Sequence, residues 1–493
     1  MKIACYVHPL VHKLGPCFDE VWSELFAGIM QCLHREAHCE CLLITGNWFK
    51  GCPGLPTIRL NEVSLYQKLR ALGDLPTSLE AAAYLVDELD HPAFHVIAEE
   101  VARSVDNFAP DIVLGVGGHA NYLAKLWPKA LRLHVECGPY SRNPYPSTMF
   151  FDHLGMHGRS VVGRFGRRIA AGAVTTEGHA LVSAFRSKMA LALKVSDPFE
   201  SRDFRSCYDR LCLLPLQVSN EFSFDEQAPY RSQFEFLYDV LCSAPKDVGI
   251  IVTEHPAGRP VLKRRGPHAN VDYLRKTFPN LIFFDEFRTY ATTSQFLVPR
   301  VDGVWSVSSS VGYQALLLGR TLGTPSSAHL SQIAHATTFR EFFEQLGAPT
   351  HRNLDAFLAW QLERYLVPEA LYSDGPWLCD YLQRRLNSAK SATDPVDAFV
   401  PIAETDQLTD AWIKHVPRPQ ALRSMWPTGD AELFEVMRHR DALLKAVSWR
   451  AIAPFRVAAG RLVVVREIIE EWLSRSMSLL KGVTQYFTEA KVP

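Results

Sequence analysis

Short apolar runs that end in turn residues alternate with longer amphipathic stretches along most of this chain. Short buried runs are typical of strands, and apolar residues at i, i+3 and i+4 spacing are typical of helices. In the first half the pattern predicts strands at 2–7, 40–45, 112–116 and 131–136, with a helix at 21–37. In the second half it predicts strands at 211–217, 248–254, 281–285 and 303–308. This alternation predicts βαβ units and a mostly parallel sheet in each half.

A charged stretch at 196–210 separates the two series, and the alternation stops near residue 385. We therefore expect an N-terminal Rossmann-like domain at 1–200, a second Rossmann-like domain at 201–385, and a linker with a basic helical tail at 386–493. Two α/β domains that face each other across a cleft form the GT-B architecture, in which ligands lie at the carboxyl ends of the strands. A single large doubly wound sheet is the alternative.

Bulk composition excludes several classes of protein. The 52 basic and 53 acidic residues balance, so no nucleic acid partner is expected. The eleven cysteines form no C-x-x-C pair and are expected to be free thiols in a reducing cytosol. Because no signal-peptide core and no apolar run of about 18 residues is found, we expect a cytoplasmic protein that does not span a membrane.

A serine-rich segment follows the last predicted strand and opens a helical run. Ser308, Ser309 and Ser310 would lie at the helix N-terminus, where backbone N–H groups and the helix dipole favour a phosphate. Gly312 would let a ligand approach the backbone closely. Serine capping of a buried helix is the ordinary alternative.

Two other predicted strands end in polar residues. The strand at 248–254 ends at His255, which can donate a hydrogen bond to a phosphate or a carboxylate, or bind a nearby carbonyl group. The strand at 211–217 ends near Gln217 and Glu221, and Glu221 is the candidate nucleophile or acid/base. A lone acid at this position is also common as a solvated residue or a helix cap.

In their order and spacing, these three segments resemble the bacterial capsule-polysaccharide biosynthesis family, which includes β-Kdo transferases that use CMP-Kdo. The resemblance covers roughly residues 130–325. The positions that match the family's P-L-Q-V, H-P and S-x-x-G…A-L-L-x-G motifs are Pro215, Leu216, Gln217, Val218, His255, Pro256, Ser309, Ser310, Gly312, Ala315, Leu316, Leu317 and Gly319.

This resemblance implies a retaining glycosyltransferase with CMP-Kdo as its donor and a glycan or glycolipid as its acceptor. Retention through a covalent intermediate requires a carboxylate nucleophile, and the matching position is Glu221. The family usually has Asp there, so Asp225 is the alternative. The resemblance assigns the CMP phosphate to the residues named at the strand ends: Gln217, His255, Ser308, Ser309, Ser310 and Gly312.

The first half adds two stretches that resemble the family. HVECGPYSR at 134–142 and MFFDHLG at 149–155 suggest that Glu136 and Asp152 line the acceptor side, one of them as general base. An ion pair between Glu136 and Arg142 is the structural alternative. The sequence contains no D-x-D motif, so no metal and no cofactor other than the donor is expected.

The tail differs from the rest of the chain. Residues 438–466 carry seven Lys or Arg side chains against one acid, Asp441, among apolar residues such as Trp449 and Phe455. Basic and aromatic residues together favour an anionic membrane surface, so we expect peripheral binding at the inner face of the cytoplasmic membrane. The segment AVSWRAIAPFR at 446–456 partly matches an S-W-R-x-T-x-P-L-R segment of bacterial glycan-assembly proteins. An amphipathic helix packed on the domains is the alternative.

Two other functions remain open from the sequence. Sugar-nucleotide 2-epimerases share the GT-B layout, as do other transferases. A non-catalytic polysaccharide assembly protein is the third possibility, since Glu221 departs from the family's Asp.

Overall fold

The computed structural model describes residues 1–414, except 8, 10–25, 27, 47–52, 62–63, 66, 69–92, 117–120, 219–221, 256–259, 265–268, 291 and 349–353. The chain divides into two units, Met1–Met425 and Trp426–Pro493, and all described residues lie in the first. The predicted nucleophile Glu221, Pro256 of the H-P motif and the chain from 415 onward lie outside the described residues, as do positions 21–25 and 27 of the helix predicted at 21–37. The described part of that predicted helix is helical at 26 and 28–36.

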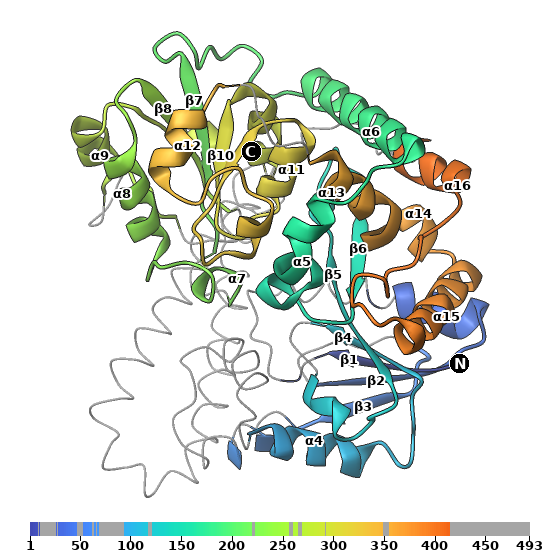
Figure 1. The fold of residues 1–493 in the computed structure, drawn as a ribbon. Coiled ribbons are helices and arrows are strands. Elements are labelled where there is room, and N and C mark those ends of the chain that lie inside the picture. The colour runs from blue at the N-terminus through green and yellow to red at the C-terminus, as the bar shows by residue number, and fades with distance from the viewer. Residues whose placement is uncertain are drawn as a thin grey trace, which may run out of the picture. The chain divides into compact units, whose positions relative to one another are not determined.

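The first sheet has seven strands among the described residues, in the order β12-β6-β5-β4-β1-β2-β3 (Figure 1). The strands β5, β4, β1, β2 and β3 are parallel, while β6 runs antiparallel to β5 and to β12. Four strands were predicted, and the short strands β3, β6 and β12 were not. The strand bounds are β1 Lys2–Val7, β2 Glu40–Gly46, β3 Thr57–Leu60, β4 Ile112–Val116, β5 Leu131–Cys137, β6 Thr148–Asp152 and β12 Leu366–Pro368.

The second sheet has five parallel strands among the described residues, in the order β11-β10-β7-β8-β9. All four strands predicted in this half are present, although β9 and β10 are shorter than predicted. The unpredicted edge strand β11 has only three residues. The bounds are β7 Arg210–Pro215, β8 Val248–Thr253, β9 Leu281–Ile282, β10 Gly303–Trp305 and β11 Thr321–Gly323.

Helices connect these strands, so the α/β class with two Rossmann-like sheets is confirmed and a single large sheet is excluded. Several helices begin with a side-chain cap, in which a hydroxyl or carboxylate accepts a backbone N–H bond; the capping residues are Ser160, Thr175, Ser232, Thr338 and Asp374. The helix bounds are α4 Ala93–Ser104, α5 Val161–Ala170, α6 Thr176–Val195, α7 Phe222–Asp225, α8 Gln233–Ser243, α9 Val271–Thr277, α10 Thr293–Leu297, α11 Val311–Leu317, α12 Phe339–Gln345, α13 Asp355–Trp360, α14 Glu369–Tyr372, α15 Gly375–Ser391 and α16 Thr405–Thr409.

After α13 the chain returns from the second sheet to the first. The π-helical turn η7 (Gln361–Tyr365) leads into β12, which pairs with β6 at the edge of the first sheet. Helix α15 then packs on η1 (Cys32–Glu36). The described chain ends at η8 (Asp410–Lys414), where the fully buried Trp412 contacts Phe185 of α6. No helix in the described ranges is long and apolar enough to cross a membrane.

Candidate functional site

The sheet order brings three of the predicted segments together. Strands β10, β7 and β8 are adjacent and parallel, so their carboxyl ends lie at the same edge of the second sheet. Gln217 follows β7, and its Nε2 donates a hydrogen bond of 2.8 Å to Ser308 Oγ, beyond β10. The backbone N–H of Ser308 donates in return to Gln217 Oε1 at 3.1 Å. Two of the three motifs are therefore in direct contact.

The serine segment precedes a helix, as predicted, because α11 begins at Val311 with Ser310 as its N-cap residue. Several backbone N–H groups of this segment already bind within the chain. The N–H of Ser309 donates to Ser306 Oγ at 3.3 Å, and the N–H of Val311 donates to Ser309 Oγ, also at 3.3 Å. The half-buried hydroxyls of Ser309 and Ser310, rather than a row of free amides, are thus the groups that this segment offers to an anion.

Packing accounts for the glycine in this segment. A Cβ atom on Gly312 would lie 2.9 Å from Leu330 Cδ1, which is too close for an alanine without a shift of its neighbour. Gly312 is itself buried. Its small size lets α11 pack against the 3-10 turn η6 (His329–Gln332), which explains the residue without a ligand.

His255 lies at the tip of β8 and contacts the first half of the chain. Arg142, in the loop after β5, places Nη2 3.1 Å from His255 Nε2. Burial and, to a smaller extent, charge repulsion from the Arg142 guanidinium lower the pKa of His255 to about 3. His255 is therefore neutral at pH 7 and accepts the hydrogen bond from Arg142, so the positive charge at this position belongs to Arg142.

Glu254 was given no role from the sequence, yet it joins the end of β8 to Val261, Leu262 and Arg288, which follow later in the chain. Its side chain is only 7% exposed. Oε1 accepts backbone N–H bonds from Val261 at 2.6 Å and Leu262 at 2.8 Å, and Arg288 Nε donates to Oε2 at 2.6 Å. An acid directly after a fully buried strand that ends in Thr253 was the only sequence signal for this residue.

The two acids of the first half have different surroundings. Glu136 is the second-last residue of β5 and is half-buried, and its Oε1 accepts the N–H of Cys137 at 2.9 Å. Asp152 ends β6 and is fully buried. Its oxygens accept four hydrogen bonds, from the N–H groups of Leu154, Gly155 and Val161 and from the hydroxyl of Tyr365. Such saturation is typical of a carboxylate that holds a loop and a helix start.

Burial and charge act in opposite directions on Asp152. Loss of solvation raises its pKa to about 6, although the hydrogen bonds and the buried Arg385 both favour the charged form. Arg385 donates to the carbonyl of Phe151 at 3.1 Å and lies over the ring of Phe399. Asp152 thus belongs to a buried polar network that stabilises the fold.

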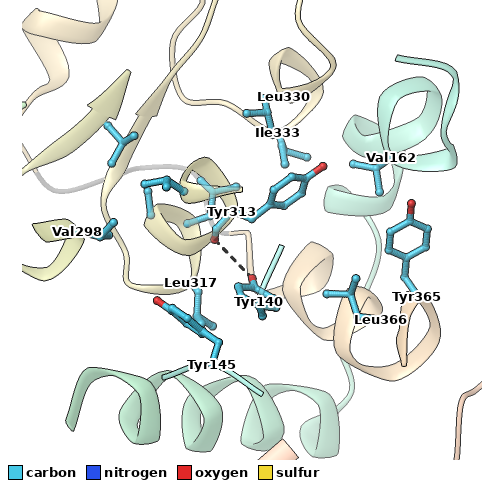
Figure 2. Packing of buried hydrophobic residues seen from close by; sticks show 14 of the residues in the cluster. Tyr140, Tyr145, Val162, Val298, Tyr313, Leu317, Leu330, Ile333, Tyr365 and Leu366 are labelled. Atoms are coloured by element: carbon cyan, nitrogen blue, oxygen red, sulfur yellow. Dashed lines mark hydrogen bonds between the residues drawn. The ribbon is translucent and has the colours of Figure 1, made fainter. Parts of the chain in front are cut away.

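Several contacts join the two halves of the first unit beside these residues. Gln314 of α11 donates to the carbonyl of Pro139 at 2.9 Å, and the Tyr140 hydroxyl donates to the carbonyl of Tyr313 at 3.5 Å (Figure 2). Arg159 forms an ion pair of 2.8 Å with Glu226. The loop between Glu136 and Arg142 is therefore held against the helix that follows the serines.

A second polar group of contacts lies near α7. His329 Nδ1 lies 2.5 Å from Gln227 Oε1, and its ring lies 5.7 Å from the ring of His157. Asp225, the alternative nucleophile, is exposed at the end of α7. Within the described ranges, no group of three or more His, Cys, Asp or Glu side chains could hold a metal ion.

The fold and these strand-end residues define an α/β protein with two Rossmann-like sheets and a polar site at the carboxyl ends of the second. Residues 190–365 match the family model described as capsule polysaccharide biosynthesis protein. The resemblance inferred from the motifs is confirmed for this part of the chain, which contains all three motifs. The stretches at 134–142 and 149–155 precede the matched residues. A search of curated proteins gave no match.

Solved structures resemble the chain only weakly. A Thermosulfurimonas dismutans KpsC β-Kdo 2,7 transferase is 15% identical, with a TM-score of 0.36 over 58% of this chain and 89% of that protein. The β-Kdo 2,4 transferase of the same protein is 17% identical, with a TM-score of 0.36 over 51% and 78%. A Methanocaldococcus jannaschii UDP-GlcNAc 2-epimerase is 13% identical, with a TM-score of 0.33 over 78% and 99%. Similarity at this level assigns neither substrate nor reaction.

Proposed function

We propose that this protein is a retaining glycosyltransferase that moves Kdo from CMP-Kdo to a glycan or glycolipid during bacterial surface polysaccharide synthesis. One observation carries the proposal. Segments that resemble the motifs of β-Kdo transferases follow the adjacent strands β7, β8 and β10, inside the part of the chain that matches the capsule polysaccharide biosynthesis family.

The donor carries two anionic groups, the phosphate of CMP and the carboxylate of Kdo. In the proposed complex Arg142 supplies positive charge, and the hydroxyls of Ser309 and Ser310 donate hydrogen bonds to these anions. The mutual hydrogen bonds between Gln217 and Ser308 fix the ends of β7 and β10 beside them. His255 orients the Arg142 side chain, because its neutral Nε2 accepts a hydrogen bond from the guanidinium.

Two displacements give retention. The carboxylate of Glu221 attacks the anomeric carbon of Kdo, the bond from that carbon to the phosphate oxygen breaks, and CMP leaves with the bonding electrons. An acceptor hydroxyl then attacks the same carbon, Glu136 takes its proton, and the Glu221 carboxylate is released. We assign the base to Glu136 rather than Asp152, because Asp152 is fully buried and accepts four hydrogen bonds.

A donor assay tests this proposal. The full chain is incubated separately with CMP-Kdo and with UDP-GlcNAc, and release of CMP or UDP is followed with and without a lipid extract as acceptor. We expect release of CMP from CMP-Kdo and no release of UDP from UDP-GlcNAc. Turnover of UDP-GlcNAc with CMP-Kdo left intact would instead favour a 2-epimerase or a different transferase.

Two variants separate the nucleophile from the fold. Glu221→Gln should still bind CMP and should lose transfer by about 10²-fold or more, as expected when a covalent nucleophile is removed. Glu200→Gln changes an exposed glutamate outside the site and serves as the matched control. Near-normal transfer by Glu221→Gln would move the assignment to Asp225.

We further propose that the protein binds the inner face of the cytoplasmic membrane through residues 431–493. The seven basic residues at 438–466, interspersed with Trp449 and Phe455, support this part of the proposal. Sedimentation with vesicles that contain anionic lipid tests it: the full chain should sediment and a 1–430 truncation should not. Equal sedimentation of the two proteins would contradict membrane binding by the tail.

A further inference from the structure

A close pair of thiols lies outside the strand-end site, between β2 and α15. Cys39 precedes β2, and Cys379 is in the second turn of α15, 340 residues later in the chain. Their Sγ atoms are 3.4 Å apart. Cys39 is 3% exposed and Cys379 is half-buried, so Cys379 is the more exposed residue of the two. The pair has no role in the proposed transfer reaction.

Neighbouring contacts hold the two thiols in this position. The N–H of Gly375, at the start of α15, donates to Glu36 Oε2 at 3.2 Å, and Cys32 Sγ donates to the carbonyl of Ser373 at 3.2 Å. A Cβ atom on Gly375 would overlap the carbonyl oxygen of Cys32, so the helix start lies directly on the backbone of η1. Contacts on the N-terminal side of Cys379 therefore fix α15 against the segment that leads to Cys39.

We propose that Cys39 and Cys379 form a disulfide under mild oxidation and thereby fasten α15 to the first sheet. A disulfide has an S–S length of about 2.05 Å and sharp geometric requirements, so most cysteine pairs in a fold cannot form one. Here the sulfurs need to approach by little more than about 1 Å, which small side-chain rotations can supply. The bond would tie the returning C-terminal segment to the N-terminal strands of the same unit.

The reaction balances with oxidised glutathione as the oxidant. The Cys379 thiolate attacks one glutathione sulfur, the glutathione S–S bond breaks, and a glutathione thiolate leaves. The Cys39 thiolate then attacks Cys379 Sγ, the mixed disulfide breaks, and the second glutathione thiolate leaves. Two protein thiols are oxidised, one glutathione disulfide is reduced to two thiols, and the protons pass from the cysteines to water and glutathione.

A third thiol nearby could form a competing disulfide. Cys41, on β2, is 2% exposed. Burial raises the pKa of its thiol, and the nearby thiols of Cys39 and Cys379 raise that pKa further. The hydrogen bond between thiols joins Cys379 to Cys39 rather than to Cys41. A link from Cys379 to Cys41 is therefore the competing product that the experiment must distinguish.

Peptide mapping tests the proposal on the folded full chain. The protein is treated with oxidised glutathione, alkylated, and digested without reduction by a protease that cleaves after glutamate, so that cleavage at Glu40 separates Cys39 from Cys41. The linked peptides are then identified by mass spectrometry. We expect one peptide pair joining Cys39 to Cys379, and a Cys39→Ala variant that keeps glutathione on Cys379. Cys242→Ser, which changes an exposed cysteine elsewhere, should still form the link.

Two results would overturn the proposal. One is a native chain whose Cys39 and Cys379 are both alkylated after glutathione treatment under conditions that oxidise the exposed Cys242. The other is a link from Cys379 to Cys41 or to another cysteine. The wild-type digest alone decides between these outcomes, so a Cys39→Ala variant that fails to fold does not leave the proposal untested.

Discussion

Glu254 is the residue before His255, and removing its carboxylate should lower the free energy of unfolding. Glu254 accepts two backbone N–H bonds, from Val261 and Leu262, and binds the Arg288 guanidinium. In Glu254→Ala all three donors lose their acceptor at once. Val261 and Leu262 also lose the group that ties them to the end of β8.

The magnitude follows from the burial of this pair. Breaking a buried ion pair by removing one partner costs about 3–5 kcal/mol, because the other charge stays buried and unpaired. The Glu254 side chain is 7% exposed, but Arg288 is 34% exposed. In the variant Arg288 also keeps its ion pair of 3.8 Å with Asp285 and its hydrogen bond to the carbonyl of Leu262, so the freed guanidinium is neither fully buried nor unpaired. We therefore expect a loss near the lower end, about 3 kcal/mol in the free energy of unfolding.

Urea unfolding followed by tryptophan fluorescence and far-UV circular dichroism measures this change. The control is Glu344→Ala, which removes the acid of an exposed Arg340–Glu344 pair on α12 and should leave stability unchanged. Glu254→Gln keeps a neutral acceptor and should recover part of the loss. A Glu254→Ala variant within about 1 kcal/mol of wild type would refute the argument that this carboxylate holds the loop.

Three other changes should have measurable effects. In Gly323→Ala the new Cβ would overlap the rings of Trp305 and Phe342, so the free energy of unfolding should fall by about 3 kcal/mol or more. The control Gly158→Ala has open space at the new Cβ and should leave the melting temperature unchanged. Trp412→Ala empties a fully buried site and removes a hydrogen bond of 3.0 Å to the carbonyl of Leu362. We expect the free energy of unfolding, measured in urea, to fall by about 3–5 kcal/mol. A fall of less than about 1 kcal/mol would show that the end of the described chain is not packed on α6. Burial lowers the pKa of His157 to about 4 from 6.5, so the unfolded chain binds the extra proton between these values and stability should fall as the pH drops from about 6.5 to 4. The raised pKa of Asp152, about 6, acts in the opposite direction over the lower part of this range in both proteins. Because His157→Gln lacks the imidazole that takes up a proton on unfolding, its melting temperature should fall less steeply with acid than that of wild type. Parallel curves would contradict this account.

The apolar pattern predicted the long strands of both sheets because their burial is continuous. Strands β1 and β8 appear within a residue of the predicted bounds. Strands β11 and β12 have three residues each. Strands β9 and β10 are as short, but they begin the longer runs 281–285 and 303–308, which the pattern predicted as strands. The pairing of β12 with β6 depends on the chain returning to the first sheet after about 200 residues, and no local pattern carries that information.

The motifs located one part of the site and misjudged the chemistry of another. The sequence placed Gln217 and Ser308 at neighbouring strand ends, and the structure joins them by two hydrogen bonds. It did not show that Ser308 and Ser309 amides would already be bound within the chain. Contacts between distant segments decide such details, as they do for Arg142 and His255, which are 113 residues apart.

Asp152 shows the same limit for an acid. At a strand end it has the sequence context of a catalytic residue, but its four hydrogen-bond donors come from residues 2 to 213 positions away. Only the tertiary structure separates this buried, saturated carboxylate from the half-buried Glu136.

Detection of a glycosyl-enzyme intermediate tests the central claim most directly. The full chain is mixed briefly with CMP-Kdo without acceptor, quenched in acid, and examined as intact protein and as a peptide digest by mass spectrometry. We predict one added Kdo residue, bound to the peptide that contains Glu221 and absent from Glu221→Gln. CMP release without any adduct, or an adduct on a different carboxylate such as Asp225, would contradict double displacement through Glu221.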